Sequence, residues 1–301
     1  MNHAIHRGAT LPELLVGIGV SLLVVMTAVA SAVRYQRSNS TVDAWMVARS
    51  QLRDASDILA ADLRGISVSG DSVLVASDTA VEFRSALGSS VVCSIPSANR
   101  ITIPPDSLPS DRILSSWVMP PDSGDMLLLY LSASQASPAQ WLRYRISAFV
   151  PVRAGVGCPA SAGLLDVTEL AGAGSAYDIT VAGSLPELRL GAPVRIVRRV
   201  RYSVYRGGDG LWYLGYRRCT TTCAAIQPVS GPYNAPGGPA PVTLLYFDHA
   251  GRRLSPSGPT SALASVEITI RTTFAHPLWF PGMPARSGDT IRSVVALRNS
   301  R

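Results

Sequence analysis

The hydrophobic pattern of the chain has three parts, and the first is an apolar segment near the N-terminus. Residues Leu14 to Val33 include no charged side chain. A helix of about 20 residues spans about 30 Å, which matches the hydrocarbon core of a bilayer. The pattern therefore predicts a membrane-spanning helix. A single carboxylate, Glu13, stands at its N-terminal edge, and a charge in that place is by default a functional residue.

The second part continues the first as an amphipathic helix. Residues 34–64 contain neither glycine nor proline, and apolar residues recur at spacings of three, four or seven. Gly65 is expected to end this helix, with Arg64 in its last turn. Both parts together predict one helix of about 55 residues and about 80 Å. Its apolar stripe, which Arg49 and Ser56 interrupt, consists of Val42, Trp45, Leu52, Leu59 and Leu63.

Beyond Gly65 the apolar residues alternate, which is the period of strands with one buried face. In residues 263–274, for example, Val266, Ile268 and Ile270 alternate with polar residues. The turn sequences 207–210 and 248–251 predict two β-hairpins. The fold class is therefore α+β: a long N-terminal helix and a mainly antiparallel sheet. The predicted strands are residues 80–84, 91–95, 125–131, 140–150, 194–206, 211–218, 242–247, 252–254, 263–274 and 290–298.

Three stretches between these strands are predicted to be loops, because proline, glycine and small residues dominate them. They are residues 104–121, 154–191 and 226–241. About 235 residues follow Gly65, which is enough for one sizeable core or two small domains.

The sequence around Glu13 resembles a known processing motif. Residues 8–16, GATLPELLV, are similar to the N-terminal motif of type IV prepilins and pseudopilins. In that family a prepilin peptidase cuts after the glycine and methylates the new N-terminus. The resemblance implies cleavage between Gly8 and Ala9, N-methylation of Ala9 and an assembly role for Glu13. Ala9 replaces the usual large apolar residue, and Pro12 suits the first turn of a helix.

The resemblance also implies an organisation for the whole chain. Residues 1–8 are a leader peptide, 9–33 the transmembrane half of the first helix, 34–65 its amphipathic half and 66–301 a β-rich head. The protein is then a single-pass inner-membrane protein with its N-terminus in the cytoplasm and its head in the periplasm, before it enters a pilus or pseudopilus. Its partners are the prepilin peptidase and other pilin subunits, which it contacts through the first helix.

The large head and the closing strand at residues 291–299 are similar to minor pilins of the PilW and PulJ (GspJ-like) type. Such subunits prime or cap a type IV pilus or a type II secretion pseudopilus. Inside a bundle of apolar helices, an ionised Glu13 needs a cation. The new N-terminus of Ala9 on a neighbouring subunit supplies one, so this ion pair is expected to set the axial register.

Two other interpretations of the N-terminus remain open. The first is an ordinary signal peptide cleaved after Ala30-Ser31-Ala32, although its apolar core exceeds the typical length of about 7–15 residues. The second is a plain single-pass anchor. Neither interpretation assigns a role to Glu13.

The chain has four cysteines, Cys93, Cys158, Cys219 and Cys223, and an even number outside the cytoplasm predicts two disulfides. The pairing of Cys219 with Cys223 and of Cys93 with Cys158 is favoured, but three pairings are open and the sequence does not choose. A metal site is disfavoured because the C-x3-C spacing has no histidine nearby.

The net charge of +7 comes from arginine alone, since the chain has no lysine. Arginines crowd residues 189–218, and Arg195, Arg199 and Arg201 share one face of a predicted strand. Tyrosines and a tryptophan are interleaved with them, as on a surface that binds DNA or phosphate. The alternative function is therefore a DNA-binding or adhesive pilin, and a solvated sheet face with core aromatics is the structural alternative.

No sequence feature indicates an enzyme or a cofactor. After cleavage at Gly8 only His249 and His276 remain, and no nucleophile motif, phosphate loop or HExxH sequence is present. The sequence Asp122-Ser-Gly-Asp125 suggests a calcium site or, more commonly, a turn. The expected protein has no catalytic residue, no resident metal and no cofactor.

Overall fold

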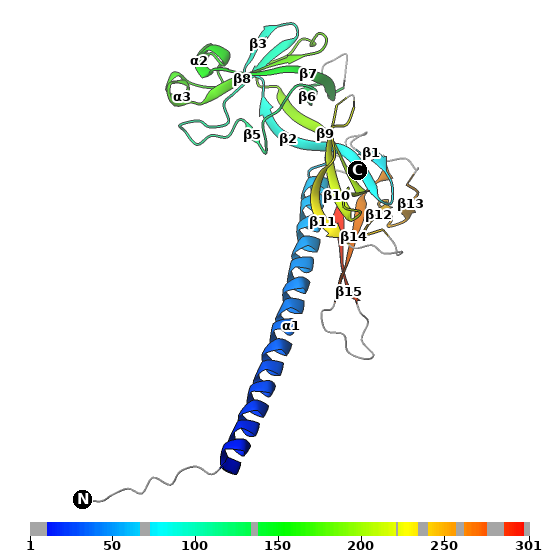
Figure 1. Cartoon of the computed structure of the whole chain (residues 1–301). Coiled ribbons are helices and arrows are strands. Elements are labelled where there is room, and N and C mark those ends of the chain that lie inside the picture. The colour runs from blue at the N-terminus through cyan, green and yellow to red at the C-terminus, as the bar shows by residue number, and fades with distance from the viewer. Residues whose placement is uncertain are drawn as a thin grey trace, which may run out of the picture.

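The first helix is a single rod that projects from the head. The computed structural model describes residues 11–66, 73–133, 138–220, 222–233, 240–256, 262–275 and 286–297. Helix α1 (Leu11–Arg64) has 54 residues, which at 1.5 Å per residue is about 80 Å. The amide of Gly65 donates to the carbonyls of Ala61 and Asp62, at 3.2 and 3.1 Å, where the helix ends. The predicted continuous helix is confirmed (Figure 1).

The predicted apolar stripe is correct only in the last third of the helix. Leu52, Leu59 and Leu63 are fully buried, whereas Val42 and Trp45 remain 49% and 38% exposed. Ala48 is the first buried residue among the described side chains of α1, and Ala44, one turn earlier, is only partly buried. Small side chains that complete the buried face are Ala48, Ala55, Ser56 and Ala60.

Two sheets form the head, and all strand pairs in the described residues are antiparallel. The larger sheet has the order β1-β2-β9-β6-β7-β8-β4-β3, with β5 on β2 and β10–β11 on β9. Its strands are β1 (Val73–Ala76), β2 (Ala80–Val91), β3 (Ser94–Ser97), β4 (Arg100–Ile103), β5 (Ser116–Trp117), β6 (Met126–Leu131), β7 (Gln140–Arg153), β8 (Ser175–Val181), β9 (Pro193–Arg206), β10 (Trp212–Cys219) and β11 (Gln227–Tyr233). The smaller sheet has the order β13-β12-β14-β15, with β12 (Val242–Phe247), β13 (Arg253–Leu254), β14 (Ser265–Ala275) and β15 (Arg286–Ala296).

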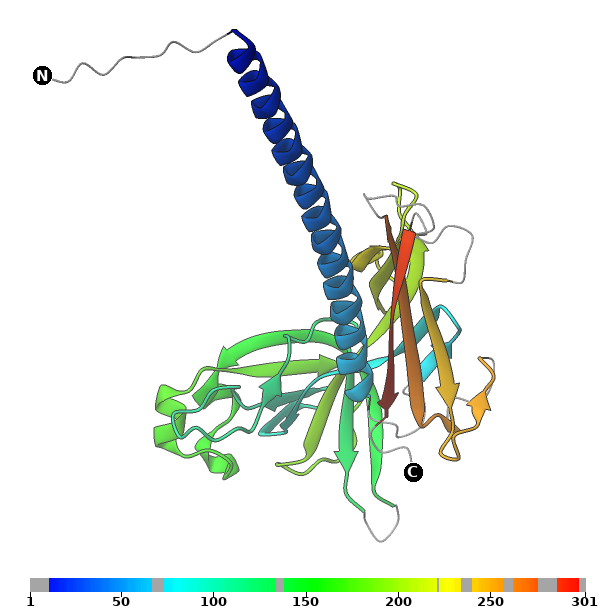
Figure 2. The same ribbon diagram turned by 90° about the horizontal axis from the view of Figure 1, so that it is seen from below.

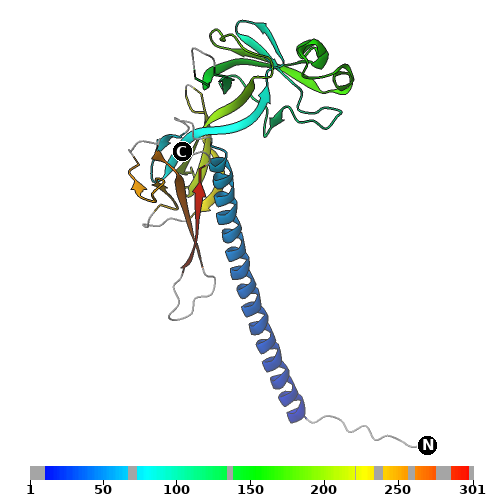
Figure 3. The same cartoon turned by 180° about the vertical axis from the view of Figure 1, so that it is seen from behind.

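The head has two lobes, which β2 and β9 join. The proximal lobe contains β1, β10, β11 and the smaller sheet, and packs on α1. The distal lobe contains β3 to β8 and the short helices α2 (Ala154–Gly157), η1 (Ala160–Ala162) and α3 (Val167–Gly172). Figures 1 and 3 show β2 and β9 running from one lobe into the other. The proximal lobe has one hydrophobic cluster, and the distal lobe has a larger cluster and a smaller one around Cys93 and Cys158.

The proximal core holds α1 against the head. Its buried residues come from α1, from both sheets and from the end of the chain, and α1 packs mainly on β14 and β15. Figure 2 shows α1 running beside these strands. Ser56, predicted to interrupt the stripe, is buried, and its Oγ lies 2.9 Å from Ser293 Oγ on β15. A small polar pair thus brings the helix close to the sheet.

Several predicted strands are confirmed, and others were missed. The hairpins β9–β10 and β12–β13 form as predicted, and Val266, Ile268 and Ile270 of β14 are fully buried. The predicted polar face of β14 is also covered, since Glu267 is buried under Arg292. Residues 91–95 are not one strand: β2 ends at Val91 and β3 begins at Ser94.

The predicted loops contain more regular structure than expected. The stretch 154–191 includes α2, η1, α3 and β8, and the stretch 226–241 includes β11. Asp166 caps α3: its carboxylate accepts from the Glu169 amide at 2.8 Å, and the Glu169 carboxylate accepts from the Asp166 amide. The prediction of a long loop was therefore wrong here, because Ala- and Gly-rich composition concealed a capped helix and a central strand.

Candidate functional site

The outer half of α1 is apolar and uncovered. Residues Leu11–Gln36 form one helical stretch of 26 residues that is long and apolar enough to cross a membrane, and the head buries none of it. The predicted segment Leu14 to Val33 lies within it. Leu14, Leu23 and Met26 are 56%, 66% and 62% exposed, so the stretch presents apolar side chains on all sides. Such a surface needs lipid or other helices around it.

Glu13 lies in the first turn of α1, where the helix dipole favours a carboxylate. Its position at the edge of the apolar stretch agrees with the sequence expectation. Gly8 and Ala9, the predicted cleavage and methylation residues, lie outside the described residues.

A half-buried acid links α1 to the sheet. The carboxyl group of Asp62 accepts a 2.7 Å hydrogen bond from the phenol of Tyr202 on β9, which is buried. Burial raises the pKa of Asp62, and the Tyr202 hydrogen bond partly opposes that shift. A second link joins the Ser230 hydroxyl of β11 to the Gln51 carbonyl at 3.0 Å.

Asp62 predicts a pH-dependent part of the stability. Since the folded state binds the Asp62 proton more tightly than the unfolded chain does, its contribution is complete below about pH 4 and is lost as the pH rises through the raised pKa. We expect Asp62→Asn to remove this loss, so the variant gains stability relative to the wild type between acidic and neutral pH. Urea unfolding as a function of pH measures it. Asp57→Asn, on an exposed position of the same helix, is the control, and parallel curves for wild type and Asp62→Asn would contradict the assignment.

A buried ion-pair network lies where the two lobes meet. On one edge, β9 pairs with β6 up to Val197 and with β10 from Arg199 onward. Arg198 stands between these pairings, and its guanidinium donates from Nε and an Nη to both Asp125 oxygens, at 2.9 and 2.7 Å. The Asp125 and Arg198 side chains are only 1% and 9% exposed. This hydrogen-bonded carboxylate raises the pKa of Arg198.

The same network occupies the segment with the calcium-like spacing. Arg218 of β10 donates to Asp122 at 2.8 Å and to the Ser123 carbonyl at 2.9 Å. The Asp125 amide donates to the Asp122 carbonyl, and Gly124 has a φ of +90°, so the segment is a turn. Arg218 holds the pKa of Asp122 below its usual value. Because arginines neutralise both carboxylates, the structure favours the turn over the calcium site.

The arginines predicted to share a face do so, but with different surroundings. Arg199 and Arg201 both lie against the buried carboxylate of Glu82 on β2, Arg201 at 3.7 Å. Arg195 lies farther along β9, in the distal lobe, with its guanidinium 5.0 Å from the centre of the Trp141 ring. The predicted trio is therefore not one cluster, because the neighbouring strands change along β9.

Two arginines that the sequence analysis did not select join this surface. Antiparallel register places Arg84 opposite Arg199, and Arg217 opposite Arg201. Arg84, Arg199, Arg201 and Arg217 are hereafter the arginine ladder. The signal was present as i, i+2 spacing in β2 and β10, but sequence spacing does not give the register between strands.

Both disulfides form in the structure. Cys93 pairs with Cys158 inside the distal lobe, and Cys219 pairs with Cys223 at the end of β10. This is the favoured arrangement among the three that the sequence left open. The described residues contain no free cysteine.

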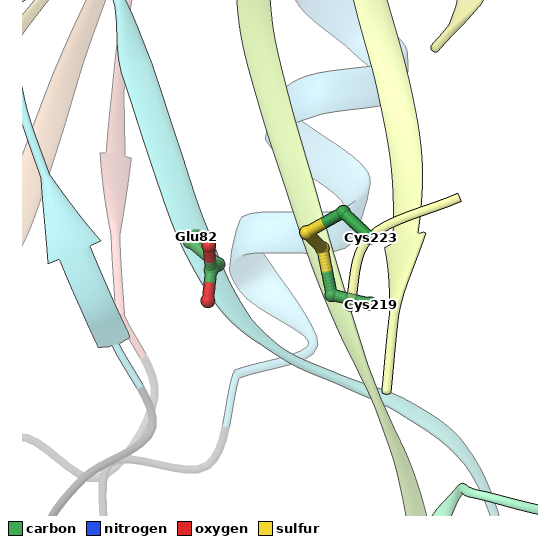
Figure 4. A group of neighbouring side chains, drawn as sticks. All are labelled: Glu82, Cys219 and Cys223. Atoms are coloured by element: carbon green, nitrogen blue, oxygen red, sulfur yellow. A yellow bond between two sulfur atoms is a disulfide. The ribbon is translucent and has the colours of Figure 1, made fainter. Parts of the chain in front are cut away.

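The Cys219–Cys223 disulfide lies beside the arginine ladder. Figure 4 shows it next to Glu82, with α1 behind the sheet. One carboxylate oxygen and two sulfurs lie within 4.8 Å of one another, a spacing at which three metal ligands could meet. The sulfurs are bonded to each other and form no thiolate, and Glu82 already pairs with two arginines. The arrangement is suited to anchoring arginines and not to holding a cation.

The structure describes one of the two histidines that follow the predicted leader. His249 lies in the turn between β12 and β13, where Asp248 pairs with Arg252. His276 lies outside the described residues.

Comparison of the chain with known protein families, with curated proteins and with solved structures found no match. The structure itself defines the class of protein. It is an α+β protein with one N-terminal helix that is long and apolar enough to span a membrane, and with a mainly antiparallel β-sheet head.

Proposed function

We propose that the protein is a minor pilin or pseudopilin, a structural subunit that primes or caps a type IV pilus or a type II secretion pseudopilus. One observation carries the proposal: a single 54-residue helix whose outer half is apolar and exposed and whose inner end packs on a β-rich head. A cleaved signal peptide requires no rigid continuation into the head. A filament subunit requires one, because its outer half must leave the bilayer and pack among neighbouring helices.

In this proposal the protein begins as a single-pass inner-membrane protein with its head in the periplasm. Prepilin peptidase cuts between Gly8 and Ala9 and methylates Ala9. The new N-terminus of one subunit then pairs with Glu13 of its neighbour and sets the axial register of the bundle. A head of two lobes is bulky beside one helix, which supports a place at the tip in preference to the shaft.

The mature N-terminus tests the proposal. We expect the intact mass of the mature protein, with N-terminal sequencing, to show a chain that starts at Ala9 and carries one added methyl group. A start at Val33 would instead indicate signal-peptide cleavage, and an uncut chain would indicate a plain anchor. Either of these two results would contradict the proposal.

Glu13 provides a separate prediction about assembly. We expect Glu13→Leu to be cleaved normally but to enter filaments at a small fraction of the wild-type level, because the register-setting charge is lost. Glu13→Asp should keep most of the assembly. Ser21→Ala is the control, since the Ser21 hydroxyl donates to the Gly17 carbonyl of its own helix at 2.8 Å. The readout is the amount of protein in sheared filaments. Assembly of Glu13→Leu at the wild-type level would exclude the register role.

A further inference from the structure

The smaller sheet ends on a long strand that pairs on one side only. Among the described residues, β15 pairs with β14 over all 11 of its residues and has no strand on its other side. The register between the two strands runs without a bulge. An edge strand offers unpaired N–H and C=O groups to other chains, so proteins usually shorten, bend or block such strands.

The other edge strands of the head are protected in these ways. Within the described part of the chain, β1, β3, β5, β11 and β13 also pair on one side only. β5 and β13 have two residues each, and β1 has four. Proline, which has no N–H to donate, interrupts β3 at Pro96 and β11 at Pro228 and Pro232. β15 is long and contains no proline, so it lacks both forms of protection.

Hydrogen bonds show which residues of β15 face the open edge. The Leu297 amide, just beyond β15, donates to the Ala264 carbonyl on the β14 side at 2.9 Å, whereas the Thr290 amide donates to the Asp289 carboxylate at 2.8 Å. In an antiparallel ladder, residues alternate between turning both backbone groups toward the partner strand and turning both away from it. The residues of β15 that turn their backbone groups to the open edge are therefore Gly288, Thr290, Arg292, Val294 and Ala296.

The side chains of the same edge residues indicate the chemistry of a partner. Val294 is 61% exposed. Arg292 donates to the buried carboxylate of Glu267, yet its side chain remains 67% exposed, and a guanidinium has five N–H donors. A matching segment is extended and places a carboxylate near Arg292 and an apolar side chain near Val294.

A second copy of the chain matches this edge less well. Figure 1 shows β15 running along α1. Two copies anchored in one membrane through α1 have β15 strands that run in the same direction, so their open edges can pair only in parallel. In register, this pairing places Arg292 beside Arg292, and like charges directly opposite each other are destabilising.

We propose that the open edge of β15 binds an extended acidic segment of another protein, which adds a fifth strand to the four-stranded smaller sheet. Backbone hydrogen bonds supply the affinity, and the side chains of Arg292 and Val294 supply the selectivity. The proposal goes beyond the assembly role, and only the choice against a second copy uses the membrane anchor.

A fluorescein-labelled peptide with the sequence of β14, SVEITIRTTFA, is the probe, because this sequence already pairs with β15 and brings Glu267 to Arg292. Fluorescence anisotropy with the full-length protein in detergent measures the Kd of the peptide. We expect Val294→Pro to raise the Kd about tenfold or more, because it removes an open-edge N–H and its ring blocks the added strand. Val294→Thr is the control, since it keeps the N–H, and its Kd should stay within about threefold of the wild-type value.

Two N-methylated forms of the peptide test the edge on the wild-type protein. With Glu267 of the peptide on the same face as Arg292, the amides of Glu267 and Thr269 point to β15, so methylating both should abolish binding. Methylating Ile268 and Ile270 should preserve it. If the peptide instead displaced β14, the second form would also fail, because in the folded chain the amides of Ile268 and Ile270 point to β15.

A peptide with Glu267→Gln tests the acidic character of the partner and should bind about two- to fivefold more weakly. Four results would overturn the proposal: no binding of the unmodified peptide, equal losses with the two methylated forms, equal binding of the glutamine peptide, or an unchanged Kd in Val294→Pro. Self-association of the wild-type protein in sedimentation, abolished by Val294→Pro, would assign the edge to a second copy and would also overturn it.

Discussion

Asp125→Ala is expected to destabilise the head by about 3–5 kcal/mol, the cost of leaving a buried charge without its partner. The variant removes the two carboxylate oxygens that accept from the Arg198 guanidinium, a group that is 9% exposed. Among the described residues, Met119 Sδ and the Pro120 carbonyl are the acceptors that remain. It also removes the acceptor of the Asp122 amide, which donates to Asp125 at 2.8 Å. Urea unfolding of the full-length protein in detergent measures the loss.

Two variants separate the ion pair from its neighbourhood. Asp122→Ala breaks an ion pair with a 63% exposed carboxylate and should cost less than about 1 kcal/mol. Asp125→Leu combined with Arg198→Met leaves no buried charge and should recover most of the stability. If Asp125→Ala lowered the free energy of unfolding no more than Asp122→Ala does, the buried Asp125–Arg198 ion pair would not stabilise the contact between the two lobes.

The ion-pair network lies where the two lobes meet, so its loss should affect one lobe before the other. Arg198 is the residue at which β9 exchanges β6 for β10 as its neighbour, so backbone hydrogen bonds on that edge are interrupted there. The side-chain network bridges the interruption by joining β9, β10 and the turn before β6. We therefore expect Asp125→Ala to loosen the distal lobe first, with earlier amide exchange in β6 than in β14.

The second large effect is expected from the Cys93–Cys158 disulfide. It closes a loop with a sequence separation of 65, whereas Cys219–Cys223 closes one of 4. In the chain-entropy account the longer loop contributes about 4 kcal/mol and the shorter about 2 kcal/mol. The double variant C93A/C158A should therefore be destabilised about twice as much as C219A/C223A.

Unfolding with and without reductant checks this comparison. In reductant, the wild type should lose the stability that both disulfides contribute. Each double variant should lose only the stability contributed by the one disulfide that it retains. An equal or larger loss in C219A/C223A would mean that the short disulfide acts through native contacts, such as those beside Glu82, and not through loop entropy.

The sequence predicted most elements whose periodicity is long and local. The unbroken helix, the hairpin around Gly207–Gly210 and the alternation in β14 each follow from neighbouring residues. It failed where composition concealed an element, as in β8 and α3, and where coverage by another element decided burial. Val42 was expected to be buried and is exposed, whereas Ser56 was expected to interrupt the buried stripe and is buried, because contact with the head decides which residues of α1 are covered.

The candidate site divides in the same way. Consecutive residues of the sequence are enough to identify the membrane-length segment with Glu13 at its edge and the excess of arginine around β9. Tertiary structure alone decided that Arg198 is a buried ion-pair residue while Arg199 is surface-exposed, although they are adjacent in the chain. Alternate residues of a strand face opposite sides, and their partners come from strands far away in sequence. Local sequence thus determined the helix and most strands, whereas the pairing of distant strands decided that Arg198 meets Asp125 and that Arg199 and Arg201 meet Glu82.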